Sequence, residues 1–281
     1  MSALSFSIIV PTRDRNAQLE QCLVRIVSDV QNVAHDHEII VTDDSPAQTA
    51  KVLIDDLFPS VQWIAGPRRG PAANRNAGAA MARGRFLVFI DDDCLPDPGL
   101  LDGYTRAISD DVSVYEGRIT CRDGIVSPRQ TAPINLTGGL LWSCNFAIRR
   151  DTFRDLGGFD ERFPIAHLED ADLRDRLLAA GYLIHFVPEA SVDHPARMLP
   201  WGAELAQMHR ATILYMTLHP PTRSLPWFLQ NQLRFRLSHV IHRRFSRDSL
   251  SALGSLVLEL LVTTWHWRAW NRWARALADA K

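Results

Sequence analysis

Short apolar runs alternate with helical patterns through the first third of the chain. The runs are typical of buried strands and cover residues 6–10, 38–42, 61–65 and 85–90. The intervening segments place apolar or small residues at helical spacing and cover residues 17–30, 47–57 and 74–82. Strands and helices in this order predict an α/β fold with a mainly parallel central sheet covered on both faces.

Polar clusters follow three of the predicted strands. Pro11-Thr12-Arg13 ends the first, Asp43-Asp44 ends the second, and Asp91-Asp92-Asp93 ends the fourth. Because ligands of such sheets bind beyond the carboxyl ends of the strands, we expect the three clusters to share one rim.

The aspartate triplet is the most informative of these clusters. Three neighbouring carboxylates repel one another unless a cation lies among them, and Mg²⁺ or Mn²⁺ binds carboxylates together with substrate phosphates. We therefore interpret the triplet as a metal-diphosphate clamp. The alternative is a solvated turn, since Asp and Pro are common after strands. The glycine-rich fingerprints of dinucleotide folds and P-loops are absent, which disfavours dehydrogenases and P-loop enzymes.

The middle of the chain is less regular. Residues 112–120 and 182–187 are predicted strands, residues 121–136 a loop, and residues 140–148 an apolar segment. A helix is predicted from Asp170 to Gly181, which is a natural C-terminal stop. Acids at its start, Glu169 and Asp170, suit capping and the helix dipole, or alternatively a general base.

Charge is divided unevenly along the 281 residues. Residues 223–281 hold ten basic and three acidic side chains, a net charge of +7, whereas the preceding residues hold 21 basic and 29 acidic ones, a net charge of −8. This asymmetry indicates that the tail meets an anionic surface or docks on the acidic body.

The tail is predicted to be helical and is rich in tryptophan and arginine. Five of the eight tryptophans fall in it: Trp227, Trp265, Trp267, Trp270 and Trp273. Interleaved Trp and Arg favour peripheral contact with a membrane, while a helical cap or a homo-oligomer interface is the alternative. Nucleic-acid binding is disfavoured because no reader motif accompanies the basic residues.

The location of the chain follows from three features. The four cysteines show no metal-binding or disulfide spacing, no secretory leader is recognisable, and no apolar run reaches membrane-spanning length. We expect a cytoplasmic protein, either free or peripheral on the inner face of the membrane.

The chain resembles the family 2 glycosyltransferases, which have the GT-A fold. The similarity runs from about Phe6 to His194 and rests on the order of seven segments: SIIVPTRDR, EIIVTDDS, GPAANRNAG, FLVFIDDDCLPDPGLL, CNFAIRR, GGFDERF and HLEDADLRDRLLAAG. The resemblance implies inverting transfer of a sugar from a nucleotide-diphosphate donor to a hydroxyl acceptor with Mn²⁺ or Mg²⁺. It also implies a catalytic domain at 1–200, with a donor half at 1–98 and an acceptor half at 99–200. The helical extension at 201–281 lies outside the resemblance.

The resemblance also assigns residues to the nucleotide pocket. Pro11, Thr12 and Arg13 match the loop that lines it, and Asp43 or Asp44 matches the acid that hydrogen-bonds the nucleobase.

Further matches concern the donor and its metal. Arg75 and Asn76 match a helix-start segment that approaches the donor. Asp91 and Asp93 match the outer positions of the DxD motif, and Asp92 between them is assigned to the ribose or sugar.

The remaining matches concern the acceptor side. Asp170, preceded by Glu169, matches the base of inverting members, and His194 matches a further metal ligand of some members. Trp142 is a candidate for stacking on an acceptor sugar, with a core position as the alternative. Two other classes stay open: a catalytically inactive scaffold subunit, and a sugar-nucleotide pyrophosphorylase.

Overall fold

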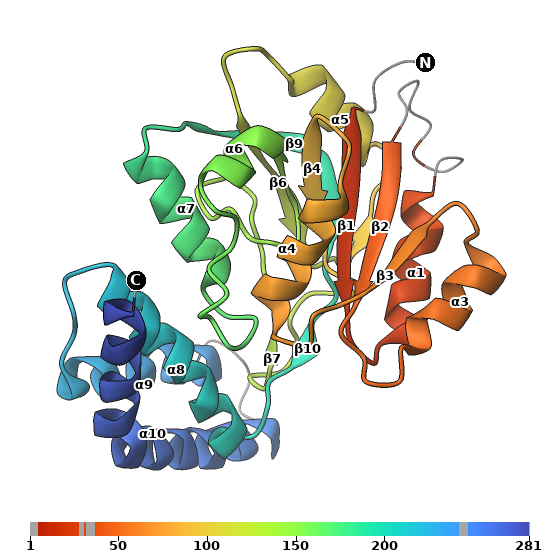
Figure 1. The fold of residues 1–281 in the computed structure, drawn as a ribbon. Coiled ribbons are helices and arrows are strands. Elements are labelled where there is room, and N and C mark those ends of the chain that lie inside the picture. The colour runs from red at the N-terminus through yellow and green to blue at the C-terminus, as the bar shows by residue number, and fades with distance from the viewer. Residues whose placement is uncertain (1–4, 28–30, 32–36, 242–246, 281) are drawn as a thin grey trace. The chain divides into compact units, whose positions relative to one another are not determined.

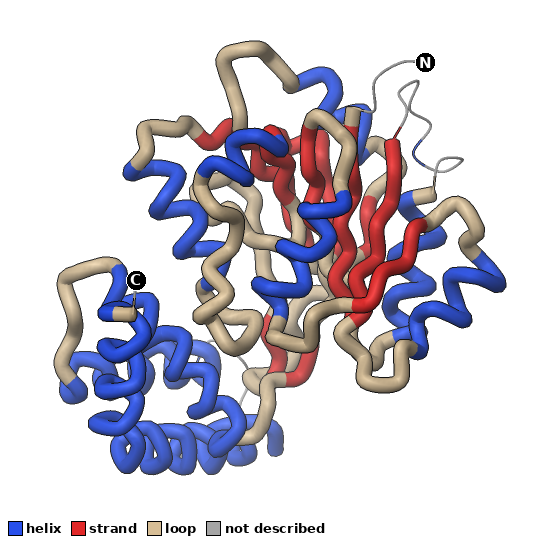
Figure 2. Tube along the Cα trace, in the orientation of Figure 1, coloured by secondary structure: helices blue, strands red, loops and turns tan. Residues whose placement is uncertain are grey.

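The computed structural model describes residues 5–27, 31, 37–241 and 247–280. Its contacts divide the chain into two compact units. The sheet unit comprises Met1–Arg122 and Pro133–Pro195, and the helical unit comprises Asp123–Ala132 and Ala196–Lys281. The two units differ in secondary structure: the sheet unit contains the long strands, and long helices dominate the helical unit (Figure 2).

An eight-stranded sheet forms the centre of the sheet unit, in the order β3-β2-β1-β4-β8-β6-β9-β5 (Figure 1). Its first four strands are parallel to one another: β1 (Phe6–Thr12), β2 (His37–Asp43), β3 (Gln62–Ala65) and β4 (Phe86–Phe89). The other four are β5 (Leu95–Pro96), β6 (Val114–Thr120), β8 (Phe146–Arg149) and β9 (Ile184–Asp193). Strand β8 runs antiparallel to both of its neighbours, β4 and β6. The predicted α/β fold with a mainly parallel central sheet is confirmed.

Helices cover both faces of this sheet. One apolar cluster joins the sheet to α1 (Asn16–Ile26), α3 (Thr49–Leu57) and α5 (Leu100–Ala107). A second joins it to α4 (Pro71–Met81), α6 (Arg150–Asp155) and α7 (Glu169–Ala179). Successive side chains of β1 enter opposite clusters, as Ile8 and Ile9 do, because strand side chains alternate between faces.

Several predicted boundaries need correction. Helix α5 was not predicted, and the apolar segment 140–148 becomes a strand only from Phe146. The strand predicted at 182–187 continues to Asp193, and the loop predicted at 121–136 contains the short strand β7 (Gln130–Thr131). The predicted helix 17–30 is observed to Ile26, and positions 28–30 lie outside the described residues.

Three helices build the helical unit: α8 (Gly202–Leu218), α9 (Leu225–Ile241) and α10 (Arg247–Asp279). Strand β10 (Arg197–Met198) pairs with β7 beside them. Among the described residues, no helix is both long and apolar enough to cross a bilayer.

A buried ionic cluster links the three helices. The Glu259 carboxylate of α10 lies 2.9 Å from His209 Nε2 of α8 and 3.6 Å from Arg236 Nε of α9. Gly202 permits close approach of α8 to α10, because a Cβ there would lie 2.1 Å from the Ser255 carbonyl oxygen. The cluster and the close contact explain why a tail with mixed polar and apolar residues packs as one unit.

Candidate active site

The three polar clusters meet at one edge of the sheet, as predicted. Thr12, the last residue of β1, donates a hydrogen bond from its hydroxyl to Asp92 Oδ2 over 2.7 Å. Asn74 at the start of α4 donates to the carbonyl oxygen of Thr42 over 3.0 Å. The first contact fastens the end of β1 to the loop after β4, and the second fastens the end of β2 to the start of α4. Asp92 is fully buried, and the Thr12 hydroxyl holds its carboxylate at this rim.

Arg15, just before α1, neutralises two of the aspartates. One guanidinium nitrogen lies 2.9 Å from Asp92 Oδ1, and another donates to Asp93 Oδ2 over 2.8 Å. Burial nevertheless raises the pKa of Asp92 to about 7, against the opposing effect of Arg15.

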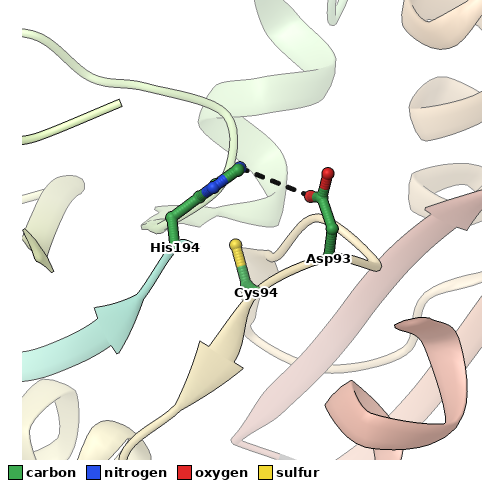
Figure 3. Close-up of side chains that lie close together, drawn as sticks. All are labelled: Asp93, Cys94 and His194. Atoms are coloured by element: carbon green, nitrogen blue, oxygen red, sulfur yellow. Dashed lines mark ion pairs between the residues drawn. The ribbon is translucent and has the colours of Figure 1, made fainter. Parts of the chain in front are cut away.

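Asp93 and His194 form the candidate metal-binding pair (Figure 3). His194 follows β9, is almost fully buried, and directs Nε2 to Asp93 Oδ1 at 3.4 Å. Ligand atoms of Asp93, Cys94 and His194 all lie within 4.8 Å of one another. Burial opposes the charged imidazole, but the hydrogen bond to Asp93 raises the pKa of His194. Burial also raises the pKa of the Cys94 thiol.

Arg75 connects the aspartate rim to the acids of α7. Its guanidinium donates to Asp91 Oδ1 over 2.6 Å and to Glu169 Oε1 over 2.8 Å. Both Arg75 and Glu169 are buried, and Glu169 Oε2 is buried with no hydrogen-bond partner among the described residues. This one side chain thus joins two groups of carboxylates that are far apart in the sequence.

Asp170 is partly exposed, whereas its neighbour Glu169 is buried. Its carboxylate accepts hydrogen bonds from the backbone N–H groups of Ser143, over 3.2 Å, and Ala171, over 2.8 Å. Burial is the main cause that raises the pKa of Asp170, and burial likewise raises the pKa of Glu169 to about 7. A carboxylate with a raised pKa that is oriented by two backbone groups suits proton abstraction better than an acid already engaged by Arg75.

Asp43 and Asp44 differ in their surroundings. Asp43 accepts hydrogen bonds from the backbone N–H groups of Ser45 and Ala50, so its carboxylate organises the loop before α3. Asp44 Oδ1 accepts one from the backbone N–H of Arg68. A Cβ on Gly66 would lie 2.2 Å from Asp44 Oδ1, so the absence of a side chain there leaves room for that carboxylate.

Other predicted site residues make contacts away from the aspartate triplet and the acids of α7. Arg13 is exposed and its side chain lies 3.9 Å from that of its neighbour Asp14, and Pro11 is buried within β1. Asn76 exchanges hydrogen bonds with the backbone of Phe159 at 2.9 Å, which engages its amide in a loop. Trp142 is partly buried and packs against the apolar core, and its stacking on an acceptor sugar stays a prediction.

The sequence interpretation missed three polar residues that shape the site. Arg15 was missed, and Arg13 was chosen instead, because the sequence does not show which of the two arginines turns back to the aspartate triplet. Glu116 is buried in β6 and accepts hydrogen bonds from the backbone N–H groups of Gly139, Leu140 and Leu141. Asn145 accepts from the Tyr104 hydroxyl over 2.7 Å. Glu116 is a charged residue within a predicted strand. That position was the sequence signal that could have identified it as the acid that holds the loop at Gly139–Leu141.

Comparison with known proteins assigns a family to this arrangement. A family model described as glycosyl transferase family 2 matches residues 7–157, which is more than half of the chain. A pre-mycofactocin glycosyltransferase of Mycobacterium tuberculosis is 28% identical over 223 residues, covering 71% of this chain and 45% of that protein. An N-acetylglucosaminyl-diphospho-decaprenol L-rhamnosyltransferase of the same species is 36% identical over 118 residues, covering 40% of this chain and 38% of the relative. The chain thus spans less than half the length of these relatives.

Solved structures share the fold. A mannosyltransferase from Pyrobaculum calidifontis, in complex with GDP-Man and Mn²⁺, superposes with a TM-score of 0.56 at 18% identity over 100% of this chain and 89% of that one. GalNAc-T7 with UDP, GalNAc and Mn²⁺ gives a TM-score of 0.55 at 17% identity over 85% and 55% of the two chains. The architecture is therefore that of the GT-A glycosyltransferases, and the family match over residues 7–157 shows that this chain belongs to glycosyl transferase family 2.

Proposed function

We propose that the protein transfers a sugar from a nucleotide-diphosphate sugar to a hydroxyl acceptor. The observation that carries this proposal is the Arg75 bridge. The Arg75 guanidinium binds Asp91 of the aspartate triplet and also Glu169, which precedes the candidate base. Donor activation and acceptor deprotonation need separate carboxylates at one place, and the bridge brings them together.

The donor is proposed to bind along the strand ends. Asp44, whose neighbour Asp43 is occupied by backbone groups, is the better candidate for the nucleobase. Thr12 and Asp92 fix the floor of the pocket, and Arg75 offers positive charge toward the diphosphate. In the proposed division, residues 1–98 hold the donor, 99–200 the acceptor, and 201–281 form an extension.

Asp93 and His194 would hold a divalent metal ion, together with Asp91. Their carboxylate oxygens and imidazole nitrogen fit a first-row ion such as Mn²⁺, whereas Mg²⁺ prefers oxygen ligands alone. When bound, the ion would neutralise the charge that develops on the departing diphosphate. The Mn²⁺ in related GT-A structures supports the choice.

Asp170 is proposed to take the proton of the attacking hydroxyl. Its carboxylate is held by two backbone N–H groups, and burial keeps its pKa above the usual range, closer to the working pH of a general base. With the base beside the acceptor and no carboxylate assigned as a nucleophile, direct displacement with inversion at the anomeric carbon is the proposed course. The anomeric configuration of the product checks it.

The acceptor is proposed to be a glycan or lipid-linked hydroxyl. The names of several relatives, such as the diphospho-decaprenol rhamnosyltransferase, place a lipid diphosphate on their acceptors. We accordingly propose peripheral contact of the helical unit with the inner face of the membrane.

Donor binding is expected to depend on both the metal and Asp93. A thermal-shift panel of UDP-, GDP- and dTDP-sugars should show one donor class that raises the Tm with Mn²⁺ and has little effect without it, since selective binding stabilises the folded state. Asp93→Ala should abolish the Mn²⁺-dependent shift, because it removes one of the two paired ligands. Asp102→Ala, which removes a partly exposed acid of α5, should retain the shift.

Three results would count against this assignment. An unchanged donor affinity in Asp93→Ala would reject the clamp. Failure of every donor class to bind or to be hydrolysed with Mn²⁺ would favour an inactive scaffold subunit instead. Formation of a nucleoside triphosphate from donor and pyrophosphate would favour a pyrophosphorylase.

A further inference from the structure

One exposed face of helix α10 changes from apolar to basic along its length. Its apolar half consists of Leu250, Val257, Leu261 and Trp265, which are 60%, 58%, 63% and 84% exposed. Its basic half consists of Arg268, Arg272 and Arg275, all exposed. We call these seven residues the outer stripe.

The helical period explains why the outer stripe is continuous. Successive members are separated by seven, four, four, three, four and three residues. Because an α-helix has 3.6 residues per turn, these spacings keep the side chains on the same side of α10. The opposite side is buried in the helical unit and includes Leu256, Glu259, Thr263, Trp270 and Ala274. The stripe is therefore the face of α10 that the helical unit leaves uncovered.

Most tail tryptophans are engaged inside the helical unit. Trp270 is buried, the ring of Trp267 lies 5.2 Å from that of Phe228, and Trp273 lies under the Arg210 guanidinium at 4.7 Å. Two tail tryptophans are exposed: Trp227 of α9 at 42%, and Trp265 at 84%, at the junction between the apolar and basic halves of the outer stripe. On α10, therefore, Trp265 is the tryptophan that remains available for the predicted membrane contact.

The charges of the stripe select an anionic partner. Its three arginines form no ion pair with any residue that the structure describes, and the acids Asp248 and Asp279 lie at the two ends of α10. A second copy of this chain would offer the same face. Symmetric pairing along the whole stripe would therefore set arginine against arginine or bury an arginine under leucine. An anionic bilayer provides a complement to both halves, with phosphates for the arginines and the acyl boundary for the apolar residues.

We propose that the outer stripe of α10 binds the surface of an anionic lipid bilayer. Leu250, Val257, Leu261 and Trp265 enter the boundary between head groups and acyl chains, and the three arginines lie on lipid phosphates. Tryptophan suits the junction because its ring is apolar and its N–H can stay among polar groups. The proposal specifies the membrane contact proposed above, but it does not depend on the transfer chemistry.

Vesicle co-sedimentation of the full-length protein tests the basic half. Arg268→Gln/Arg272→Gln/Arg275→Gln should weaken binding to phosphatidylglycerol-containing vesicles by about tenfold or more, since each arginine near an anionic surface contributes to binding. The matched control is Arg85→Gln/Arg106→Gln/Arg154→Gln, which removes the same charge from exposed positions of the sheet unit and should bind as the wild type does. Wild-type binding should also fall when the salt concentration rises from about 0.1 M to about 1 M, where screening is strong.

The apolar half has its own test. Leu261→Ser/Trp265→Ser should weaken vesicle binding, whereas Val52→Ser/Leu183→Ser, at exposed apolar positions of the sheet unit, should leave it unchanged. Hydrolysis of free donor should persist in all four variants, so loss of vesicle binding is distinguishable from failure of the proposed reaction. Wild-type affinity in both stripe variants would overturn the proposal. So would a change confined to oligomeric state in sedimentation velocity, because it would make the stripe a contact between copies.

Discussion

Replacement of Asp170 by Asn is expected to lower kcat by about 10²–10⁴-fold, the usual contribution of a positioned general base. The amide keeps the shape of the side chain, but its single oxygen can accept from only one of the backbone N–H groups of Ser143 and Ala171, and it cannot take the acceptor's proton. Donor affinity should change little, because the proposed donor ligands lie on the strand ends and Arg75. Steady-state kinetics together with donor titration would measure both quantities.

A neighbouring acid of α7 provides the matched control. Asp175 pairs with Arg174 on the same helix and is not part of the carboxylate groups around Arg75. Asp175→Asn should therefore retain kcat within about twofold, since surface ion pairs contribute little. Full activity in Asp170→Asn would reject the base assignment, and a comparable loss in both variants would point to a disturbed helix.

Arg75→Met is expected to lower the free energy of unfolding by about 3–5 kcal/mol, as removal of one partner from a buried ion pair generally does. The substitution leaves Glu169 buried without its cation and frees the Asp91 carboxylate. Urea unfolding of the metal-free protein would measure the change. Arg75→Met/Glu169→Gln should recover part of the loss, because the buried charge is removed with its partner. A loss in the double variant as large as that in the single variant would contradict the account.

The destabilisation by Arg75→Met should grow with pH. In the folded chain the pKa of Glu169 is raised to about 7 by burial, compared with about 4.3 in an unfolded chain. The folded state therefore keeps a proton through this window, and the free energy of unfolding falls as pH rises across it. Without Arg75 the pKa rises further, so the fall extends to higher pH. Unfolding at about pH 5 and about pH 8 should show the larger effect at the higher pH, and equal effects would contradict the buried-carboxylate explanation.

The sequence predicted those parts of the fold that depend on local patterns. Alternating apolar runs located β1 to β4, and the polar residues after them located the shared rim. Helix α5 was missed because Leu100, Leu101 and Tyr104 follow closely on a Pro- and Gly-containing turn. Its existence depends on burial against the sheet, a tertiary contact that periodicity over eight residues does not reveal.

Roles within the site depend on directions that a sequence does not encode. Asp43 and Asp44 are adjacent, yet only the structure shows that backbone N–H groups occupy Asp43. Arg13 and Arg15 both follow closely on the end of β1, but it is Arg15 that turns back to the aspartates. The pairing of Arg75 with Glu169 spans 94 residues of sequence. Spacing predicts which residues approach an edge, whereas packing decides which side chain faces the substrate.

A crystal structure with Mn²⁺ and a nucleotide-diphosphate sugar tests the central claim most directly. We expect one manganese ion, identified by its anomalous peak, that is bound by Asp93, His194 and oxygens of the diphosphate. Asp170 should lie beside the anomeric carbon. It would be contradicted by a donor bound elsewhere, or by a structure at saturating manganese and donor in which Asp93 stays paired only with Arg15 and His194 and no metal is present.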